Sequence, residues 1–325
     1  MWIDPTMKNY TIDMEKEYGT NCWDITFDRI WSHFDWFAFG HYWGWGMKAL
    51  LLRHYGICWS ISIMWELTEM AFGHLLPNFY ECWWDNMVLD VLLCNGLGIF
   101  TGMQGKCLDF QVLYFAFRQV NNLFNISSLN KVSFFFSVCK WFEMREHHWE
   151  SIKNIKTKKG KIKRALLQFT PESFNSTRWL DPECSWMRFV AIFQLVLAFQ
   201  LVELNTFFVK HFFPMPAEHP ICVVRILLQG LMSAPAIRQY YSYVTDKSCK
   251  RFGSQLWVFI FLILSELILN IKFGLELFSH TQISKIVLWL LLNLMISILG
   301  MVASMKIYKW RYRSGNGTTK KIKTK

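Results

Sequence analysis

The sequence has few charged residues for its length. Only 18% of its 325 residues are Asp, Glu, Lys or Arg, whereas 53% are hydrophobic and 18% are aromatic. An ordinary soluble domain is about 25% charged, so this composition argues against a soluble protein. We therefore expect a membrane protein, in which each helical crossing of the bilayer takes about 20 mostly apolar residues.

The chain also lacks any clustering of its cysteines. None of the nine lies in a Cys-x-x-Cys pair, and none is combined with histidine at the spacing of a metal site. This distribution indicates neither a disulfide framework nor a zinc site. We expect most of these cysteines to be small apolar side chains that fill space between helices.

Six apolar stretches are long enough to cross a bilayer as helices. They are residues 49–76, 84–103, 189–213, 221–243, 255–278 and 283–305, and acids interrupt the first two. The sequence therefore predicts an all-α fold, a polytopic transmembrane helix bundle. We treat residues 1–325 as a single integral membrane domain.

Positive charge is concentrated in two runs, residues 153–164 and 306–325, within a formal net charge of +11. Both runs adjoin apolar stretches, where the positive-inside rule predicts a cytoplasmic position. Nucleic acid binding is the alternative, but we expect no nucleic acid partner. Four predicted spans separate the two runs, and a smaller basic loop, residues 247–251, follows the second of these spans. The two runs and this loop therefore fall on the same side of the membrane. We expect a cytosolic C-terminal tail, in which Lys321 and Lys323 match a dilysine signal of the endoplasmic reticulum.

Four carboxylates interrupt the second quarter of the chain. Glu66 and Glu69 are three residues apart and share one helix face, whereas Glu81 and Asp85 are four apart and share another. Each charge at the centre of a span costs roughly 2.5 to 3.5 kcal/mol, so something must offset this cost. Pro77 disfavours helix at the residue before it. We predict a helix–turn–helix hairpin that brings the two pairs together.

Such a set of oxygen atoms is typical of a hard cation such as Ca²⁺ or Mg²⁺, and we prefer Ca²⁺. Asn78 lies in the predicted turn, and Asp90 and Asn95 continue along the second helix. Ca²⁺ takes six to eight oxygen ligands at variable angles, which a flexible turn can supply. The predicted Ca²⁺ ligands are Glu66, Glu69, Glu81 and Asp85. In the alternative interpretation the acids are simply solvated at a membrane surface.

His41 lies upstream, next to two glycines. Gly40 and Gly44 are four residues apart, a spacing that lets another helix or a lipid approach the backbone closely. Histidine can accept a proton near neutral pH, so His41 is a candidate general base. Its alternative role is that of an interfacial histidine among tryptophans.

A third group lies near the expected cytoplasmic end of residues 221–243. Here Arg238 is followed by Gln239 and Tyr240. An arginine can hold a lipid phosphate through two parallel hydrogen bonds, so these three are candidate substrate-binding residues. An aromatic and basic interfacial anchor is the alternative.

Several long strings resemble the eukaryotic base-exchange phosphatidylserine synthases, in the order found in that family. They are SHFDWFAFGHYWGWGMKALL, WELTEMAFGHLLPNFYECWWDNMVLDVLLCNGLGI, GKIKRALLQFTPESF, ELNTFFVKHFF and APAIRQYYSYVTD. The Asp-Gly-x-x-Ala-Arg signature of the route through CDP-diacylglycerol is absent. The family's functionally important polar positions fall on His41, Glu66, Glu69, Asn78, Glu81, Asp85, Asp90 and Asn95.

The resemblance implies a phosphatidyltransferase of the endoplasmic reticulum membrane. Such an enzyme replaces the choline of phosphatidylcholine or the ethanolamine of phosphatidylethanolamine with L-serine, with Ca²⁺ as its cofactor. The resemblance implies catalytic roles for His41, Asn78, Asp90 and Asn95, and a tendency to form homodimers.

Two features depart from the family pattern. Family members carry further chain before the point that matches Met1, so we expect this chain to lack N-terminal spans. Residues 104–137 are an insert whose bias to Asn, Phe, Ile, Lys and Ser resembles a translated AT-rich intron. A retained intron is our preferred explanation, and a genuine membrane-embedded hairpin is the alternative.

Two other functions fit part of the pattern. A divalent-cation or proton-coupled transporter would also need acids within the membrane, but the second half of the chain has no counterparts of Glu81, Asp85 and Asp90. A catalytically inactive family member is the other alternative.

Overall fold

The computed structural model describes residues 18–104, 154–167, 179–180, 186–213, 219–246 and 249–322. Every regular element within these ranges is a helix, which confirms the predicted all-α fold. Apart from Gln104, the predicted insert lies outside the described residues.

Most of the longer helices follow the apolar stretches, and one shorter helix begins within the first basic run. The helices are α1 (Phe27–Ser32), α2 (Trp36–Leu52), α3 (Tyr55–Phe72), the 3-10 turn η3 (Pro77–Phe79), the π-helix η4 (Asp85–Asn95), α4 (Gly96–Gln104), α7 (Lys158–Leu167), α8 (Trp186–Phe212), α9 (Pro220–Thr245), α10 (Ser254–Ser279) and α11 (Ile283–Ile322). Five stretches are long and apolar enough to cross a membrane: Asp85–Gln104, α8, α9, α10 and Ile283–Ile307. They correspond to five of the six predicted spans.

The sixth predicted span, residues 49–76, is wrong as a single helix. The chain turns between α2 and α3 at Arg53, whose φ of 53° lies in the left-handed region. The side chain of His54 then caps α3 by accepting a hydrogen bond from the backbone N–H of Ile57 at 3.2 Å. The apolar composition continues through both helices, so hydrophobicity alone does not reveal the turn.

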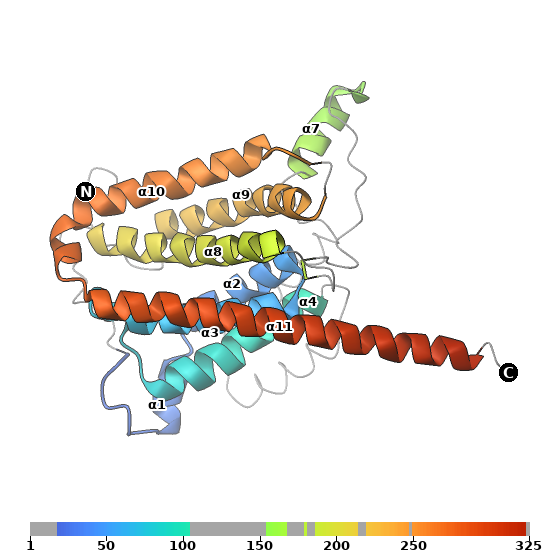
Figure 1. The fold of residues 1–325 in the computed structure, drawn as a ribbon. Helices are drawn as coiled ribbons and strands as arrows, with labels where there is room; N and C mark the ends of the chain where they lie inside the picture. The colour runs from blue at the N-terminus through green and yellow to red at the C-terminus, as the bar shows by residue number, and fades with distance from the viewer. Residues whose placement is uncertain are drawn as a thin grey trace.

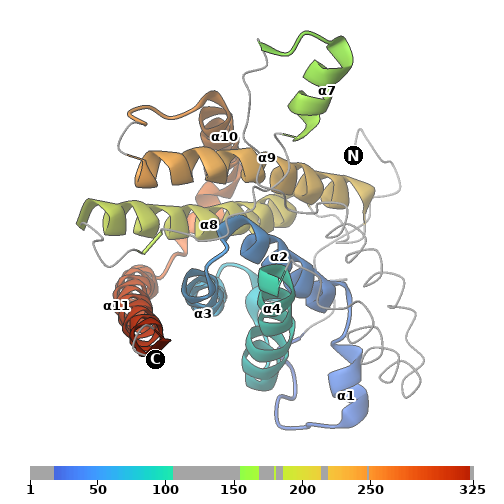
Figure 2. The same cartoon turned by 90° about the vertical axis from the view of Figure 1, so that its right-hand side faces the viewer.

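The helices pack in layers. In Figures 1 and 2, α11, α3 and α4 lie in a row, and α8 and α9 cross above them. Helices α4 and α2 approach each other closely, because a Cβ atom on Gly102 would lie 2.3 Å from the carbonyl oxygen of Gly46. No described atom lies within 4 Å of a Cβ built on Gly40 or Gly44, so no described helix makes the close approach predicted there.

The two ends of the bundle differ. At one end, the backbone N–H of Gln282 donates to Nε2 of His74, so the turn after α3 lies beside the turn between α10 and α11. At the other end, the guanidinium of Arg53 donates to the carbonyl of Gly102, and the end of α9 meets the start of α10. We call the first the site end, on the left in Figure 1, and the second the basic end, on the right, where α7 also lies.

Candidate active site

The π-helix η4 aligns three polar side chains. Asp85, Asp90 and Asn95 are spaced five residues apart, and all three are buried. A π-helix closes its hydrogen bonds between residues i and i+5, so residues at this spacing face the same way. In an α-helix, with 3.6 residues per turn, the same spacing would carry them to different faces. The spacing of five was the available sequence signal for this π-helix, and reasoning with an α-helix missed it.

Helix α3 presents Glu66 to the same space. Asn86 donates to Oε2 of Glu66 at 2.6 Å, and Nδ2 of Asn95 donates to Oε1 at 3.3 Å. Both oxygens of this buried carboxyl group are therefore held by amides of η4. The predicted hairpin is present, with η3 as its turn; the side chain of Asn78 in that turn lies outside the described residues.

Five carboxyl groups lie in this hairpin, and we call them the acid cluster: Glu66, Glu69, Glu81, Asp85 and Asp90. The carboxyl groups of Glu66 and Glu69 lie within hydrogen-bond range of each other, as do those of Glu81 and Asp90. Burial, together with the charge of Asp90, raises the pKa of Glu81 to about 8. Carboxylates this close repel one another when they are ionised, so a proton or a cation must offset the repulsion.

The oxygens of the acid cluster fit a hard cation in chemistry. Oε2 of Glu69 and Oε2 of Glu81 are buried without a hydrogen-bond partner among the described residues. A buried, unpaired carboxylate oxygen is costly and suits a Ca²⁺ ligand. As the side chains stand, no three His, Cys, Asp or Glu residues of the described ranges are close enough to hold a metal ion. Cation binding therefore requires these side chains to move closer together.

His41 of α2 is joined to the cluster through Asn95. Nδ2 of Asn95 donates to Oγ of Ser62 at 3.0 Å and to Glu66, so its Oδ1 is the acceptor. This oxygen lies 3.2 Å from Nδ1 of His41, which must then carry the hydrogen. The Nε2 atom of His41 is left as the basic nitrogen, able to accept a proton.

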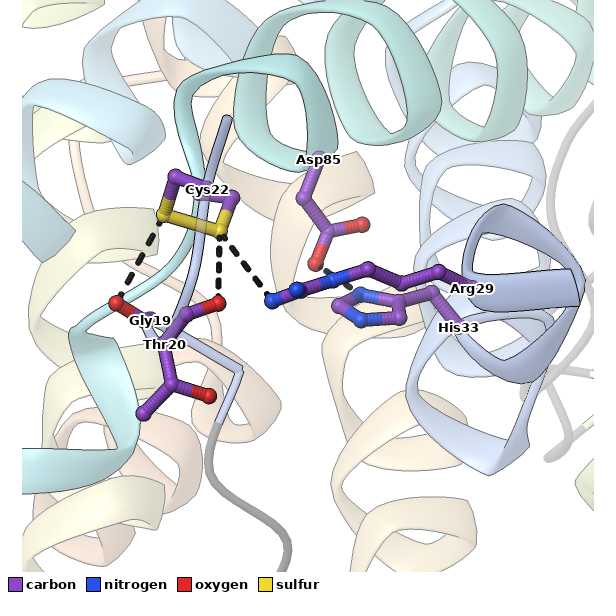
Figure 3. The surroundings of a disulfide bond; sticks show 7 residues. Gly19, Thr20, Cys22, Arg29, His33 and Asp85 are labelled. Atoms are coloured by element: carbon purple, nitrogen blue, oxygen red, sulfur yellow. Dashed lines mark hydrogen bonds and ion pairs between the residues drawn. A yellow bond between two sulfur atoms is a disulfide. The ribbon is translucent and has the colours of Figure 1, made fainter. Parts of the chain in front are cut away.

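The structure contains a disulfide that sequence analysis missed. Cys22 and Cys82 are bonded across 60 residues of chain, which corrects the expectation that these two are apolar fillers. Cys82 lies in the turn just before η4, so the bond ties the segment before α1 to the site (Figure 3). No short spacing motif marks a pair so far apart. Cys58 and Cys94, by contrast, are buried free thiols, as expected.

His33 is a second residue that sequence analysis missed. Its Nδ1 atom lies 2.5 Å from Oδ2 of Asp85, and both side chains are buried. Figure 3 shows the two side chains meeting close to the disulfide. No sequence motif links His33 to an aspartate 52 residues away.

The three predicted substrate-binding residues lie at the basic end, far along α9 from the acid cluster. Gln239 bonds to Gln255 at 3.1 Å and to the backbone of Leu256 at 2.9 Å, and the hydroxyl of Tyr240 donates to the carbonyl of Ala191 at 2.6 Å. These two side chains join helices, and the structure does not bring Arg238 and its neighbours together with the acids.

The chain is similar to known proteins over most of its length. It matches the family described as phosphatidyl serine synthase over residues 1–134 and 124–274. It is 52% identical to phosphatidylserine synthase of Drosophila melanogaster over 297 residues, which are 91% of this chain and 53% of that protein.

Two vertebrate proteins are also similar. Phosphatidylserine synthase 1 of Danio rerio is 49% identical over 290 residues, 89% of this chain and 55% of the relative. Phosphatidylserine synthase 2 of Homo sapiens is 34% identical over 267 residues, 80% of this chain and 48% of the relative. The chain thus spans about half the length of the curated relatives it matches.

Proposed function

Because the chain belongs to the phosphatidylserine synthase family, we propose that it makes phosphatidylserine by exchanging the head group of a phospholipid for L-serine. The donors are phosphatidylcholine or phosphatidylethanolamine. The serine hydroxyl forms a new bond to phosphorus, the bond to choline or ethanolamine breaks, and the proton of serine passes to the departing alcohol. The observation that carries the proposal is the junction at Asn95, which joins His41 to the acid cluster.

His41 is the proposed general base. Its Nε2 atom accepts the proton of the serine hydroxyl and returns it to the departing alcohol. Asn95 fixes the tautomer that this role requires, because its Oδ1 engages Nδ1–H of the ring. Asp90 lies within hydrogen-bond range of Glu81 and is proposed to hold that carboxyl group in place. For Asn78 we propose a catalytic role from the family resemblance alone.

Ca²⁺ is the proposed cofactor, held by Glu66, Glu69, Glu81 and Asp85. The unpaired oxygens of Glu69 and Glu81 support this assignment. When bound, a divalent cation would offset the negative charge that develops on the phosphoryl oxygens. The four carboxylates would hold and orient such an ion at the site end of the bundle.

We further propose that the chain lies in the endoplasmic reticulum membrane, with its site end towards the lumen and its C-terminal tail in the cytosol. The disulfide at the site end supports this orientation, because disulfides persist in oxidising compartments. Independently, Lys250 and Arg251 lie at the basic end, as the positive-inside rule predicts for a cytosolic face. We also propose that the chain forms a homodimer, as the family resemblance implies. Measuring the mass of the protein in detergent tests this.

Serine incorporation by the purified protein tests the proposed function. The protein in mixed micelles is given labelled L-serine, Ca²⁺ and either phosphatidylcholine or phosphatidylethanolamine, without CTP. We expect labelled phosphatidylserine and release of the corresponding free head group. The rates with the two donors show which lipid the protein prefers. A transporter would produce neither in micelles, where no gradient exists, so absence of product with both donors would overturn the proposal.

A further inference from the structure

Asp85 belongs to a small ring that is closed by the disulfide and by one hydrogen bond. Starting from the disulfide, the chain runs from Cys22 to His33 on one side and from Cys82 to Asp85 on the other. The hydrogen bond between His33 and Asp85 closes the ring. The position of the Asp85 carboxylate is therefore set from two directions, by its place in η4 and by a segment before α1.

The imidazole of His33 is held firmly in this ring. Trp84 packs against it with the ring centroids 4.8 Å apart, and Tyr18 meets it edge-on at 5.3 Å. Tyr18 is itself anchored, because its hydroxyl donates to the carboxylate of Asp35 at 2.5 Å. Only 4% of His33 is exposed. An imidazole fixed by packing can orient the carboxylate that accepts its hydrogen bond.

Asp85 in turn belongs to the acid cluster. Its charge acts on both Glu81 and Asp90, so its carboxylate lies within electrostatic range of the two. Groups that hydrogen-bond to a metal-binding carboxylate or imidazole fix its orientation, and their loss typically lowers metal affinity or activity about 10- to 100-fold. His33 has the geometry of such a group.

We propose that His33 is a positioning residue of the exchange reaction: it orients the Asp85 carboxylate for Ca²⁺, and the Cys22–Cys82 disulfide keeps His33 in place. This inference rests on the proposed function and extends it to a residue that acts through Asp85. It also assigns the disulfide a role in the site rather than in the stability of the bundle alone.

Two substitutions of His33 separate positioning from packing. His33→Phe keeps an aromatic ring between Trp84 and Tyr18 but removes the donor, whereas His33→Asn keeps a donor near the position of Nδ1. We expect His33→Phe to raise the Ca²⁺ concentration for half-maximal exchange at least about 10-fold. We expect His33→Asn to recover most of that loss.

A binding measurement makes the test independent of activity. Ca²⁺ is titrated against the purified 325-residue chain while the unfolding temperature is recorded. The Ca²⁺ concentration at the midpoint of this titration should rise by the same factor in His33→Phe. Cys22→Ser should also raise the Ca²⁺ concentration at the midpoint. Dithiothreitol, which reduces the disulfide, should raise it for the unmodified chain. Cys249→Ser, at the basic end, is the matched control and should leave it unchanged.

The outcomes are distinguishable. The proposal is overturned if His33→Phe has the same Ca²⁺ midpoint as the unmodified chain, or if His33→Asn loses as much as His33→Phe, which would indicate packing alone. If the unmodified chain binds Ca²⁺ but exchanges no serine, the proposed function fails and the binding midpoints still decide the role of His33. If the unmodified chain exchanges serine but binds no Ca²⁺, the exchange function stands and the role of His33 fails.

Discussion

The acid Glu266 and the acids of the α3–η4 hairpin have different surroundings. Glu266 of α10 faces Arg225 of α9, whose Nε and Nη2 atoms donate to Oε1 at 3.1 and 2.7 Å. Gln229 donates to both oxygens of the same carboxylate at 3.1 Å. The acid cluster on α3, η4 and the turn between them has five carboxyl groups close together, with two buried oxygens that lack a described partner.

The difference separates a structural acid from a functional one. A carboxylate paired with a guanidinium and an amide is already compensated, so it can join two helices without a ligand. A group of like charges with unpaired oxygens is costly until something binds. The acid cluster therefore has the properties of a binding site, whereas Glu266 has those of a helix contact. The predictions below test this distinction.

The largest expected effect is that of Glu81→Gln. The change keeps the shape of the side chain but removes a carboxylate from the acid cluster, and we expect it to abolish serine exchange. The measurement is labelled serine incorporation per amount of folded protein. Glu266→Gln is the matched control and should keep most of the rate; full activity in Glu81→Gln would contradict the metal assignment.

His41→Ala should have a large but different effect. Loss of a general base typically lowers the rate about 10²- to 10⁴-fold, whereas Ca²⁺ binding should be unchanged because the carboxylates remain. The pH dependence of exchange and the Ca²⁺-induced rise in unfolding temperature check the two parts. A variant that regains the full rate at high pH would argue against the role of His41 as a base.

Glu266→Ala should lower stability rather than activity. It leaves Arg225 without its carboxylate, and hydrogen bonds to charged groups are worth about 1.5 to 3 kcal/mol. The pair is partly exposed, so we expect a loss near the lower value, measured as a lower unfolding temperature in detergent. Exchange per folded molecule should be retained, and its loss would mean that this pair also serves the reaction.

Glu69→Gln should have the opposite effect on stability. In the presence of a chelator the substitution removes repulsion from the acid cluster, so we expect the protein to become more stable by about 1 kcal/mol. Adding Ca²⁺ should stabilise this variant less than the unmodified chain. Thermal unfolding with and without Ca²⁺ gives both values, and destabilisation in the chelator would show that the cluster is compensated without a cation.

The sequence predicted features that depend on neighbouring residues. Apolar runs located five helices, and Pro77 located the turn that brings Glu66 near Asp90 and Asn95. The turn at Arg53 was missed because apolar residues continue on both sides of it. The π-helix was missed because its spacing of five looks irregular on an α-helix.

Contacts between distant residues could not be predicted in this way. The bonds from Cys22 to Cys82 and from His33 to Asp85 join parts of the chain more than 50 residues apart. They depend on how α1 lies against the hairpin, and no local pattern encodes that placement. His33 and the disulfide were therefore visible only in the structure, whereas the five acids of the cluster were evident in the sequence.

The most direct test of the acid cluster as a cation site is a chelation and add-back experiment on serine exchange. The purified chain and Glu266→Gln are assayed with labelled serine, first in a Ca²⁺ chelator and then after Ca²⁺ is restored in excess. We predict that both proteins lose exchange in the chelator and recover it with Ca²⁺, and that Glu69→Gln does not recover. Exchange that continues unchanged in the chelator would contradict the account.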